Sequence, residues 1–309
     1  MRSTLSDCLV RAAEADERII VLTGDHGYAL FDEFRARFSD RFVNAGIAEQ
    51  NMIGIAAGMA RSGYRPIVYG LSAFIPVRVL EQIKLDIAHD RLPVLLLGDG
   101  AGFVYSYLGT SHQSLEDVAC TRPITGLSVL SPCDRFELRA SFELALRREA
   151  PTYMRLGKAD LGDVHDGPVD IDEGDLIPVR EGRPDGFTVI ATGSMVPVAV
   201  DIAESSRPDL SIWSAPSIKP LDGARLTRLS ERSRGIIVME EHSIIGGLGS
   251  AVCELLADRP HPPVLRIGCS ESFSHTCGSY EHLRREHGLD ARSVLTRIEE
   301  FSTGLDRGR

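Results

Sequence analysis

The feature that most constrains the fold is an alternation of short apolar runs with amphipathic segments along the first hundred residues. The apolar runs are short enough for buried strands and fall at residues 19–22, 41–44, 66–71 and 92–97. The segments between them have helical spacing of apolar residues and fall at residues 4–16, 31–38, 48–61 and 77–89. Strands that alternate with helices predict a parallel sheet covered by helices on both faces.

The second half of the chain repeats this pattern after a break. Residues 161–185 are rich in Asp, Gly and Pro and show little periodicity, which predicts a linker. Strands are then expected at residues 187–191, 210–213, 235–239 and 264–267, and helices at 196–204, 223–231, 249–258 and 279–286. With 309 residues, the chain is long enough for two domains with separate cores. We expect an α/β protein of two three-layer α/β/α domains with mainly parallel sheets, at residues 1–160 and 186–309 with the linker between them.

Composition excludes several classes of partner. The formal net charge of −10 argues against nucleic acid or an anionic membrane surface. The sequence has no apolar run of the length that a membrane-spanning helix needs, about 18 residues. Six cysteines are scattered without CxxC pairs, which indicates reduced thiols and a cytoplasmic location.

The stretch Asn44-Ala45-Gly46-Ile47-Ala48-Glu49-Gln50-Asn51 places a carboxylate between a predicted strand and a helix rich in glycine and alanine. Glu49 has two interpretations. It could lie in the first turn of its helix, where the helix dipole favours a negative charge. It could also hydrogen-bond a buried ring nitrogen, because the small residues that follow let another element or chain pack closely and desolvate the carboxyl group.

Other polar and aromatic residues follow the ends of predicted strands. Ligands of parallel α/β sheets bind beyond the carboxyl ends of the strands, so Asp25, Glu49, Phe74 and the segment 98–112 could converge there. Phe74 is either a core residue or an aromatic platform for a flat heterocycle. His112 is either a structural histidine or a group that contacts substrate.

Three further patterns favour structural roles. Gly98-Asp99-Gly100 resembles the start of a magnesium-diphosphate motif, but that motif needs a later asparagine, and the only asparagines are Asn44 and Asn51. Gly246-Gly247-Leu248-Gly249 precedes a helix but matches neither GxGxxG nor a P-loop, so we expect a structural turn. Cys269, His275 and Cys277 offer three metal ligands at poor spacing, and we expect no metal bound by this chain.

Several of these stretches together resemble the transketolase family over nearly the whole chain. Residues 41–52, Ala73-Phe74, residues 81–88 and the loop Gly109-Thr110-Ser111-His112-Gln113 are similar to the pyrimidine-binding domain of that family. Residues 217–222 and 240–249 are similar to its C-terminal domain. The combination is specific, although each piece alone is not.

The resemblance implies one half of a split, thiamine-diphosphate-dependent transketolase. A separate N-terminal-half subunit would supply the domain that binds Mg²⁺ and the cofactor diphosphate, with two copies of each chain in an α2β2 heterotetramer. By the same resemblance, Glu49 hydrogen-bonds the aminopyrimidine of the cofactor and Phe74 stacks on it. His112 transfers a proton to, or hydrogen-bonds, the sugar substrate, and Asp25 lies near the thiazolium. The implied activity is transfer of a two-carbon ketol unit from a ketose or ketose phosphate to an aldehyde or a specialised acceptor.

The sequence departs from the family at three positions that bear on substrate. Leu108 stands where the family has an aspartate that contacts donor hydroxyls, and Gly100 stands where sugar-phosphate transketolases have a histidine. Lys158 corresponds to a phosphate-binding arginine, and a lysine binds phosphate without the bidentate fork. These differences favour a modified sugar or a specialised acceptor, as in a biosynthetic pathway.

Two alternatives remain at this point. One is the beta chain of a 2-oxo-acid dehydrogenase decarboxylase, which also needs a partner chain and passes its product to a lipoyl or acyl carrier. The other is a non-catalytic subunit that retains the fold. The presence of Glu49, Phe74 and His112 together argues against a non-catalytic subunit.

Overall fold

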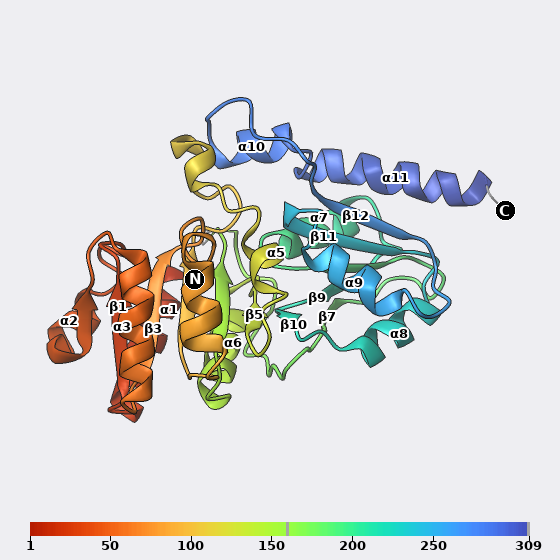
Figure 1. Cartoon of the computed structure of the whole chain (residues 1–309). Helices are drawn as coiled ribbons and strands as arrows, with labels where there is room; N and C mark the ends of the chain where they lie inside the picture. The colour runs from red at the N-terminus through yellow and green to blue at the C-terminus, as the bar shows by residue number, and fades with distance from the viewer. Residues whose placement is uncertain (159–160, 308–309) are drawn as a thin grey trace.

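The computed structural model describes residues 1–158 and 161–307, which form two sheets (Figure 1). The first sheet has seven strands in the order β10-β5-β6-β4-β3-β1-β2, and the second has five in the order β12-β11-β8-β9-β7. All pairs are parallel except β10 with β5 and β7 with β9. The predicted fold class, two α/β domains with mainly parallel sheets, is confirmed.

The four strands predicted in the first half are all present in the first sheet. They are β1 (Ile19–Thr23), β2 (Phe42–Asn44), β3 (Arg65–Leu71) and β4 (Leu95–Asp99). β4 begins three residues later than predicted, after Pro93, which has no N–H to donate to a ladder. All five residues of β1 are buried, because helices cover both faces of the sheet.

Helices α1 (Arg2–Ala15), α2 (Asp32–Arg37) and α6 (Arg135–Arg147) cover one face of the first sheet. The other face is covered by α3 (Glu49–Arg61) and by a continuous helical run from Val77 to Ala88. That run consists of a 3₁₀ turn η2 (Val77–Val79), a short α segment α4 (Leu80–Gln82) and a π segment η3 (Ile83–Ala88). The amphipathic pattern predicted a helix here and could not distinguish these three forms.

No element was predicted in the segment from residue 117 to 158, where the structure has four. They are α5 (Asp117–Thr121), β5 (Ser128–Leu130), α6 and β6 (Thr152–Leu156). β6 is fully buried but contains Arg155, so it is not a purely apolar run. Arg155 donates to Asp117 (2.8 Å), and this partner makes the buried charge tolerable.

The second sheet consists of β7 (Ile177–Arg180), β8 (Thr188–Ala191), β9 (Ser211–Ser214), β11 (Ile236–Ser243) and β12 (Val264–Cys269). The predicted strands 187–191, 210–213, 235–239 and 264–267 correspond to four of these. β7 comes from the segment 161–185, so its later residues belong to the second sheet. The predicted boundary at residue 160 lies outside the described residues.

Four helices of the second half lie within two residues of their predicted bounds. They are α7 (Met195–Ser205), α8 (Gly223–Glu231), α9 (Leu248–Leu256) and α10 (Tyr280–Glu286). A further helix, α11 (Ala291–Arg307), runs along the outside of the second domain and was not predicted (Figure 1). None of the helices in the described part of the chain is long and apolar enough to cross a membrane.

The two domains share one core. Strand β10 (Ser217–Lys219) lies in the second half of the sequence but pairs with β5 at the edge of the first sheet. One cluster of buried apolar side chains runs from Ile53 and Val68 in the first domain to Val238 and Val252 in the second. The carboxyl ends of the first sheet are therefore held against the second domain.

Candidate active site

The strand order defines a switch point in the first sheet. From β1 the chain passes to β2 on one side, then crosses to β3 on the other, so β1 and β3 are neighbours with connections that leave in opposite directions. In open α/β sheets, ligands bind in the crevice at the carboxyl ends of such strands. His26 follows β1 and Phe74 follows β3, which places both residues at this crevice.

Glu49 is the first residue of α3 and is 5% exposed. It follows the exit of β2, where Asn44 accepts a hydrogen bond from the amide of Gly46 (3.0 Å) and closes the turn. The helix dipole favours a carboxylate at this end of α3, but α3 has no side-chain N-cap hydrogen bond. Instead, Oε1 of Glu49 accepts a hydrogen bond of 3.0 Å from Nη1 of Arg78. Both interpretations of Glu49 from the sequence therefore fit its position.

Four side chains gather around the ring of Phe74. The ring centre of His112 lies 5.2 Å away in an edge-to-face arrangement, and that of His26 lies 6.2 Å away. The guanidinium carbon of Arg78 lies 3.9 Å from the ring centre and also reaches Glu49. We call Glu49, Phe74, His112, His26 and Arg78 the Phe74 cluster.

Asp25 lies at the rim of this cluster. It is exposed and has φ of 63°, a left-handed conformation that aspartate tolerates better than most residues. Asp25 and Asn44 exchange two hydrogen bonds of 3.1 Å, which join the exits of β1 and β2. The structure thus gives Asp25 a definite turn-forming role beside its predicted place near the cofactor.

His112 is carried by a loop that the second domain holds. The hydroxyl of Ser106 donates to the carbonyl of Gly278 (2.8 Å), and Ser274 donates to the side chain of Gln113 (2.9 Å). Figure 1 shows this loop, in yellow, beside the segment that leads into α10. Leu108, in the same loop, is exposed. The position of His112 therefore depends on residues more than 160 positions later in the chain.

Two of the residues linked to substrate lie outside the Phe74 cluster. Lys158 follows β6, and its ammonium group lies 5.8 Å from the ring centre of Tyr280 in the second domain. Gly100 has φ of 77° and packs under the ring of Tyr105, where a Cβ atom would come within 2.1 Å of that ring. Tyr105 also donates to Asp99 (2.8 Å), so Gly98-Asp99-Gly100 forms a braced turn after β4.

Two members of the Phe74 cluster, His26 and Arg78, were not predicted from the sequence. Nε2 of His26 is buried and has no hydrogen-bond partner among the described residues. A buried orphan nitrogen in a crevice at a switch point indicates a ligand contact. The sequence signal for His26 was its place directly after Asp25 at a strand exit, whereas nothing in the local pattern distinguished Arg78.

The crevice of the second sheet is filled by the protein itself. Its switch point lies between β8 and β11, where Ser194 and Glu241 meet with Oγ to Oε2 at 2.5 Å. Oε1 of Glu241 accepts from the amide of Phe103 in the first domain, and Oε2 also accepts from Tyr280. This position joins the domains and leaves the Phe74 cluster as the candidate site.

Glu240 explains the glycine-rich loop before α9. Its two carboxylate oxygens accept from the amides of Leu248 (2.7 Å) and Gly249 (2.9 Å), so a side chain already satisfies this helix N-terminus. A Cβ atom at Gly247 would lie 1.9 Å from Glu240, which accounts for the glycine. The loop is a structural turn, as predicted.

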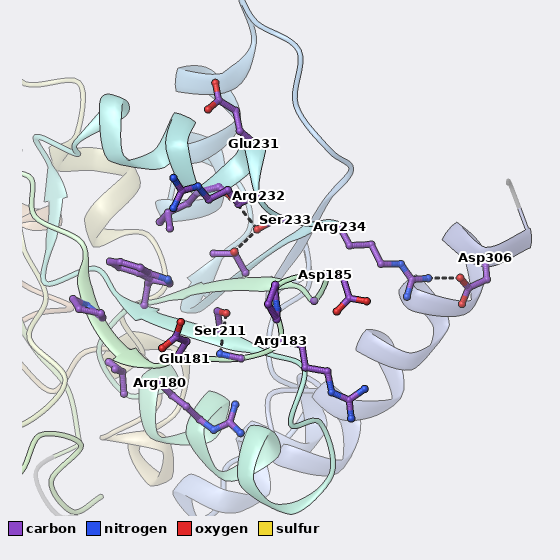
Figure 2. A pocket seen from close by; sticks show the side chains of 18 residues that line it. Arg180, Glu181, Arg183, Asp185, Ser211, Glu231, Arg232, Ser233, Arg234 and Asp306 are labelled. Atoms are coloured by element: carbon purple, nitrogen blue, oxygen red, sulfur yellow. Dashed lines mark hydrogen bonds and ion pairs between the residues drawn. The ribbon is translucent and has the colours of Figure 1, made fainter.

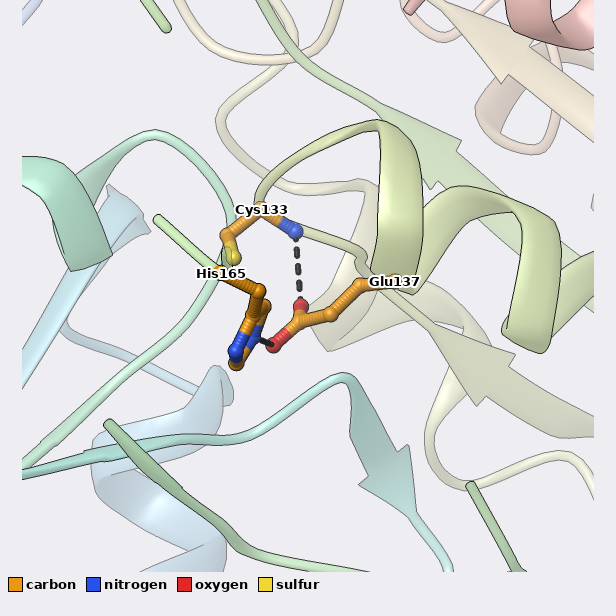
Figure 3. A group of neighbouring side chains, drawn as sticks. All are labelled: Cys133, Glu137 and His165. Atoms are coloured by element: carbon orange, nitrogen blue, oxygen red, sulfur yellow. Dashed lines mark hydrogen bonds and ion pairs between the residues drawn. The ribbon is translucent and has the colours of Figure 1, made fainter. Parts of the chain in front are cut away.

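One group of three side chains has the composition of a metal site. Cys133, Glu137 and His165 bring ligand atoms within 4.8 Å of one another (Figure 3). Both oxygens of Glu137 are engaged, by the amide of Cys133 (2.8 Å) and by His165 (2.9 Å). Burial and the neighbouring Glu137 raise the pKa of the Cys133 thiol, so it is protonated and a poor ligand. In the described part of the chain, Cys269, His275 and Cys277 form no such group.

A cavity of about 1020 Å³ lies far from the cluster, at the amino ends of β8, β9 and β11 (Figure 2). Arg234 pairs there with Asp306, and Arg180 donates to the carbonyl of Leu210 (2.8 Å). Cationic and anionic side chains line it in equal number: Arg180, Arg183, Arg232 and Arg234 against Glu181, Asp185, Glu231 and Asp306. Ligands of parallel sheets bind at the opposite edge, so the largest cavity is not the candidate site.

The Phe74 cluster has the groups that an aminopyrimidine needs. Glu49 supplies a buried hydrogen-bond acceptor, and Phe74 supplies a ring that is only partly covered. The orphan nitrogen of His26 supplies a further polar contact. The residues present therefore fit the cofactor that the family resemblance implies.

Comparison with known families gives two matches that together cover most of the chain. Residues 1–163 match the model described as the transketolase pyrimidine-binding domain. Residues 178–294 match the model described as the transketolase C-terminal domain.

Individual relatives agree with these matches. A 6-deoxy-6-sulfo-D-fructose transketolase subunit, SqwH, from Clostridium sp. is 31% identical over 98% of this chain and 94% of its own length. One of the two subunits of an apulose-4-phosphate transketolase from Phocaeicola vulgatus is 33% identical, with coverages of 97% and 96%. A solved structure described as a split-gene transketolase, inactive β4 tetramer, is 31% identical with a TM-score of 0.88, over 97% of both chains.

Proposed function

The chain belongs to the transketolase family as a subunit of the two-chain kind, and from this premise we propose that its Phe74 cluster binds and activates the aminopyrimidine of thiamine diphosphate. The observation that carries the proposal is the burial of Glu49 beside Phe74, at the switch point of the pyrimidine-binding domain. The relatives named above are transketolase subunits, which supports a transketolase over the beta chain of a 2-oxo-acid dehydrogenase.

Glu49 holds the ring nitrogen of the aminopyrimidine by a hydrogen bond to its carboxylate. Its burial makes this bond strong, because little water competes for the carboxylate. Phe74 orients the ring by stacking, and aromatic stacking contributes on the order of 0.5–1.5 kcal/mol beyond the area that it buries. When bound, thiamine diphosphate supplies the carbon nucleophile and the electron sink for cleavage of a ketose.

His112 serves the substrate rather than the cofactor. It reaches the cluster from the loop after β4, on the open side of Phe74, and its Nδ1 lies 2.9 Å from the hydroxyl of Ser111. We assign His112 the transfer of a proton at the oxygen of the donor sugar. Lys158 meets a donor phosphate, and Asp25 lies near the thiazolium.

The diphosphate and its Mg²⁺ are held by a partner subunit. We place the pyrimidine-binding domain at residues 1–160, the linker at 161–185 and the C-terminal domain at 186–309, so the diphosphate-binding domain lies on a separate chain. The helix face around Gly54 and Gly58 is open, with nothing within 4 Å of a Cβ atom at either glycine, and provides a surface for close packing. We expect two copies of each chain in the active enzyme.

The substrate is a modified sugar or is transferred to a specialised acceptor, as in a biosynthetic pathway. Leu108 is exposed beside His112 and lacks the carboxylate that would bind donor hydroxyls. Two relatives are named for 6-deoxy-6-sulfo-D-fructose and for apulose 4-phosphate, which supports a donor of this unusual kind. The six cysteines are free, which fits a reducing, cytoplasmic compartment.

The test is reconstitution with the partner subunit. The pair is assayed with thiamine diphosphate and Mg²⁺ on xylulose 5-phosphate with ribose 5-phosphate, and separately on a deoxy-sulfo ketose and an apulose phosphate. We expect thiamine-dependent ketol transfer, slow on the pentose phosphates. Efficient turnover of the pentose phosphates would contradict the altered specificity, and pyruvate decarboxylation with lipoyl acylation would favour the dehydrogenase alternative.

A further inference from the structure

Arg78 contacts both of the residues to which the proposed function assigns the aminopyrimidine. Its Nη1 donates to Oε1 of Glu49 at 3.0 Å, and its guanidinium carbon lies 3.9 Å from the centre of the Phe74 ring. A guanidinium is planar, stacks on aromatic faces and carries N–H donors in a fixed fork. The aminopyrimidine is also flat and amino-bearing, so the guanidinium makes the stack and the hydrogen bond expected of the cofactor ring.

We propose that Arg78 closes the aminopyrimidine seat, meaning Glu49 and Phe74, and that the cofactor enters by displacing the guanidinium. This inference rests on the proposed function, because the seat is defined by it. Arg78 is then a residue that governs cofactor entry, and it does not take part in the reaction.

The closed arrangement is favourable because of the difference in burial between the two partners. Glu49 is 5% exposed, and a buried carboxylate without a partner is costly. The side chain of Arg78 is 47% exposed and supplies that partner from the solvent side. Displacement leaves Glu49 with a ring-nitrogen hydrogen bond in exchange, so the carboxylate is never left without a partner.

The same exposure makes the closed arrangement easy to open. Arg78 lies in the short 3₁₀ turn η2, and among the hydrogen bonds of the described residues its side chain makes only the one to Glu49. Ion pairs with an exposed partner contribute little, and a cation over an aromatic ring adds a similarly small amount. Together these terms correspond to a competition of about 3- to 10-fold in cofactor affinity.

The experiment measures binding of thiamine diphosphate, with Mg²⁺, to the reconstituted two-subunit complex by titration calorimetry. Arg78→Ala should bind the cofactor about 3- to 10-fold more tightly than the wild type. Arg78→Lys should fall between the two, because lysine keeps the charge but loses the planar fork. Arg61→Ala is the matched control, since Arg61 is 49% exposed and pairs with Asp90 at 2.7 Å, away from the seat, and its affinity should not change.

Unchanged or weaker binding by Arg78→Ala would overturn the inference, because Arg78 would then support Glu49 instead of competing with the cofactor. Glu49→Ala distinguishes this failure from failure of the proposed function. If Glu49→Ala binds as well as the wild type, the proposed function fails. If Glu49→Ala weakens binding and Arg78→Ala does not tighten it, only the inference about Arg78 fails.

A second measurement covers the case in which Arg78→Ala does not assemble with the partner, which sedimentation velocity would reveal. A crystal structure of the wild-type complex with thiamine diphosphate reports the position of Arg78 directly. We expect the guanidinium to have left both Phe74 and Glu49. A guanidinium that remains on both residues beside the bound cofactor would overturn the inference.

Discussion

Oε1 of Glu241 accepts a hydrogen bond of 2.7 Å from the backbone amide of Phe103, which lies 138 residues earlier in the chain. The carboxylate also accepts from Ser194 and Tyr280, both at 2.5 Å. Phe103 precedes the loop that carries His112. A single buried carboxylate of the second domain therefore holds the start of that loop.

Replacement of Glu241 by alanine should destabilise the protein. Three buried donors would lose their acceptor, and each unsatisfied group costs about 1–3 kcal/mol, so we expect a loss of about 3 kcal/mol or more in the free energy of unfolding. Urea denaturation measures it. Glu254→Ala is the control, because the Glu254 side chain is 62% exposed and its pair with Arg122 should contribute less than about 1 kcal/mol. Equal losses in the two variants would contradict the prediction.

Replacement of Glu49 by alanine should abolish turnover in the reconstituted pair. Loss of a group that activates a ring nitrogen should lower kcat by about 100-fold or more, the range of acid–base contributions. Steady-state kinetics at saturating thiamine diphosphate measure it. Glu33→Ala, at an exposed position on α2, should retain wild-type activity. Activity in Glu49→Ala like that of the wild type would support a non-catalytic subunit.

Replacement of His26 by leucine should separate stability from activity. Nε2 of His26 has no partner in the described structure, so its removal should leave the free energy of unfolding unchanged or raise it by about 1 kcal/mol. If the orphan nitrogen binds a ligand, kcat/KM should fall about tenfold, which corresponds to one lost hydrogen bond. Thermal melting and initial rates together test this. A variant that loses stability and keeps its activity would assign His26 to the core.

Replacement of Lys158 by methionine should raise KM for a phosphorylated donor. The loss of one charge contact to phosphate should raise KM about tenfold and change kcat little. Lys158→Arg should restore or improve binding, because arginine binds phosphate with two parallel hydrogen bonds. A donor without phosphate is the internal control, and an equal rise in its KM would show that Lys158 acts through its packing near Tyr280.

The pair of His165 and Glu137 should make stability depend on pH. Burial lowers the pKa of His165, but the hydrogen bond and charge of Glu137 outweigh it, so the pKa is raised above the usual 6.5. A raised folded-state pKa stabilises fully below pH 6.5 and loses this contribution as the pH rises through the folded value. The wild type should therefore exceed His165→Gln most at pH 5.5 and least at pH 8.5, by urea denaturation. A difference that is constant over this range would contradict the ion pair.

Much of the fold followed from patterns that span fewer than about 15 residues. The alternation of apolar runs with amphipathic segments predicted β1 to β4 and the helices between them, because burial on a sheet or helix face imposes a local period. β6 escaped prediction because Arg155 breaks its apolar run, and its partner Asp117 lies 38 residues away.

By itself, the sequence determined which residues stand at strand exits and helix starts, and so placed Glu49, Phe74 and His112 at one edge of the first sheet. The tertiary structure decided the rest, because a buried polar group takes whichever partner folding brings within about 3 Å, regardless of separation in the chain. Arg78 reaches Glu49 across 29 residues and Phe103 reaches Glu241 across 138. Local spacing contains no information about such pairs.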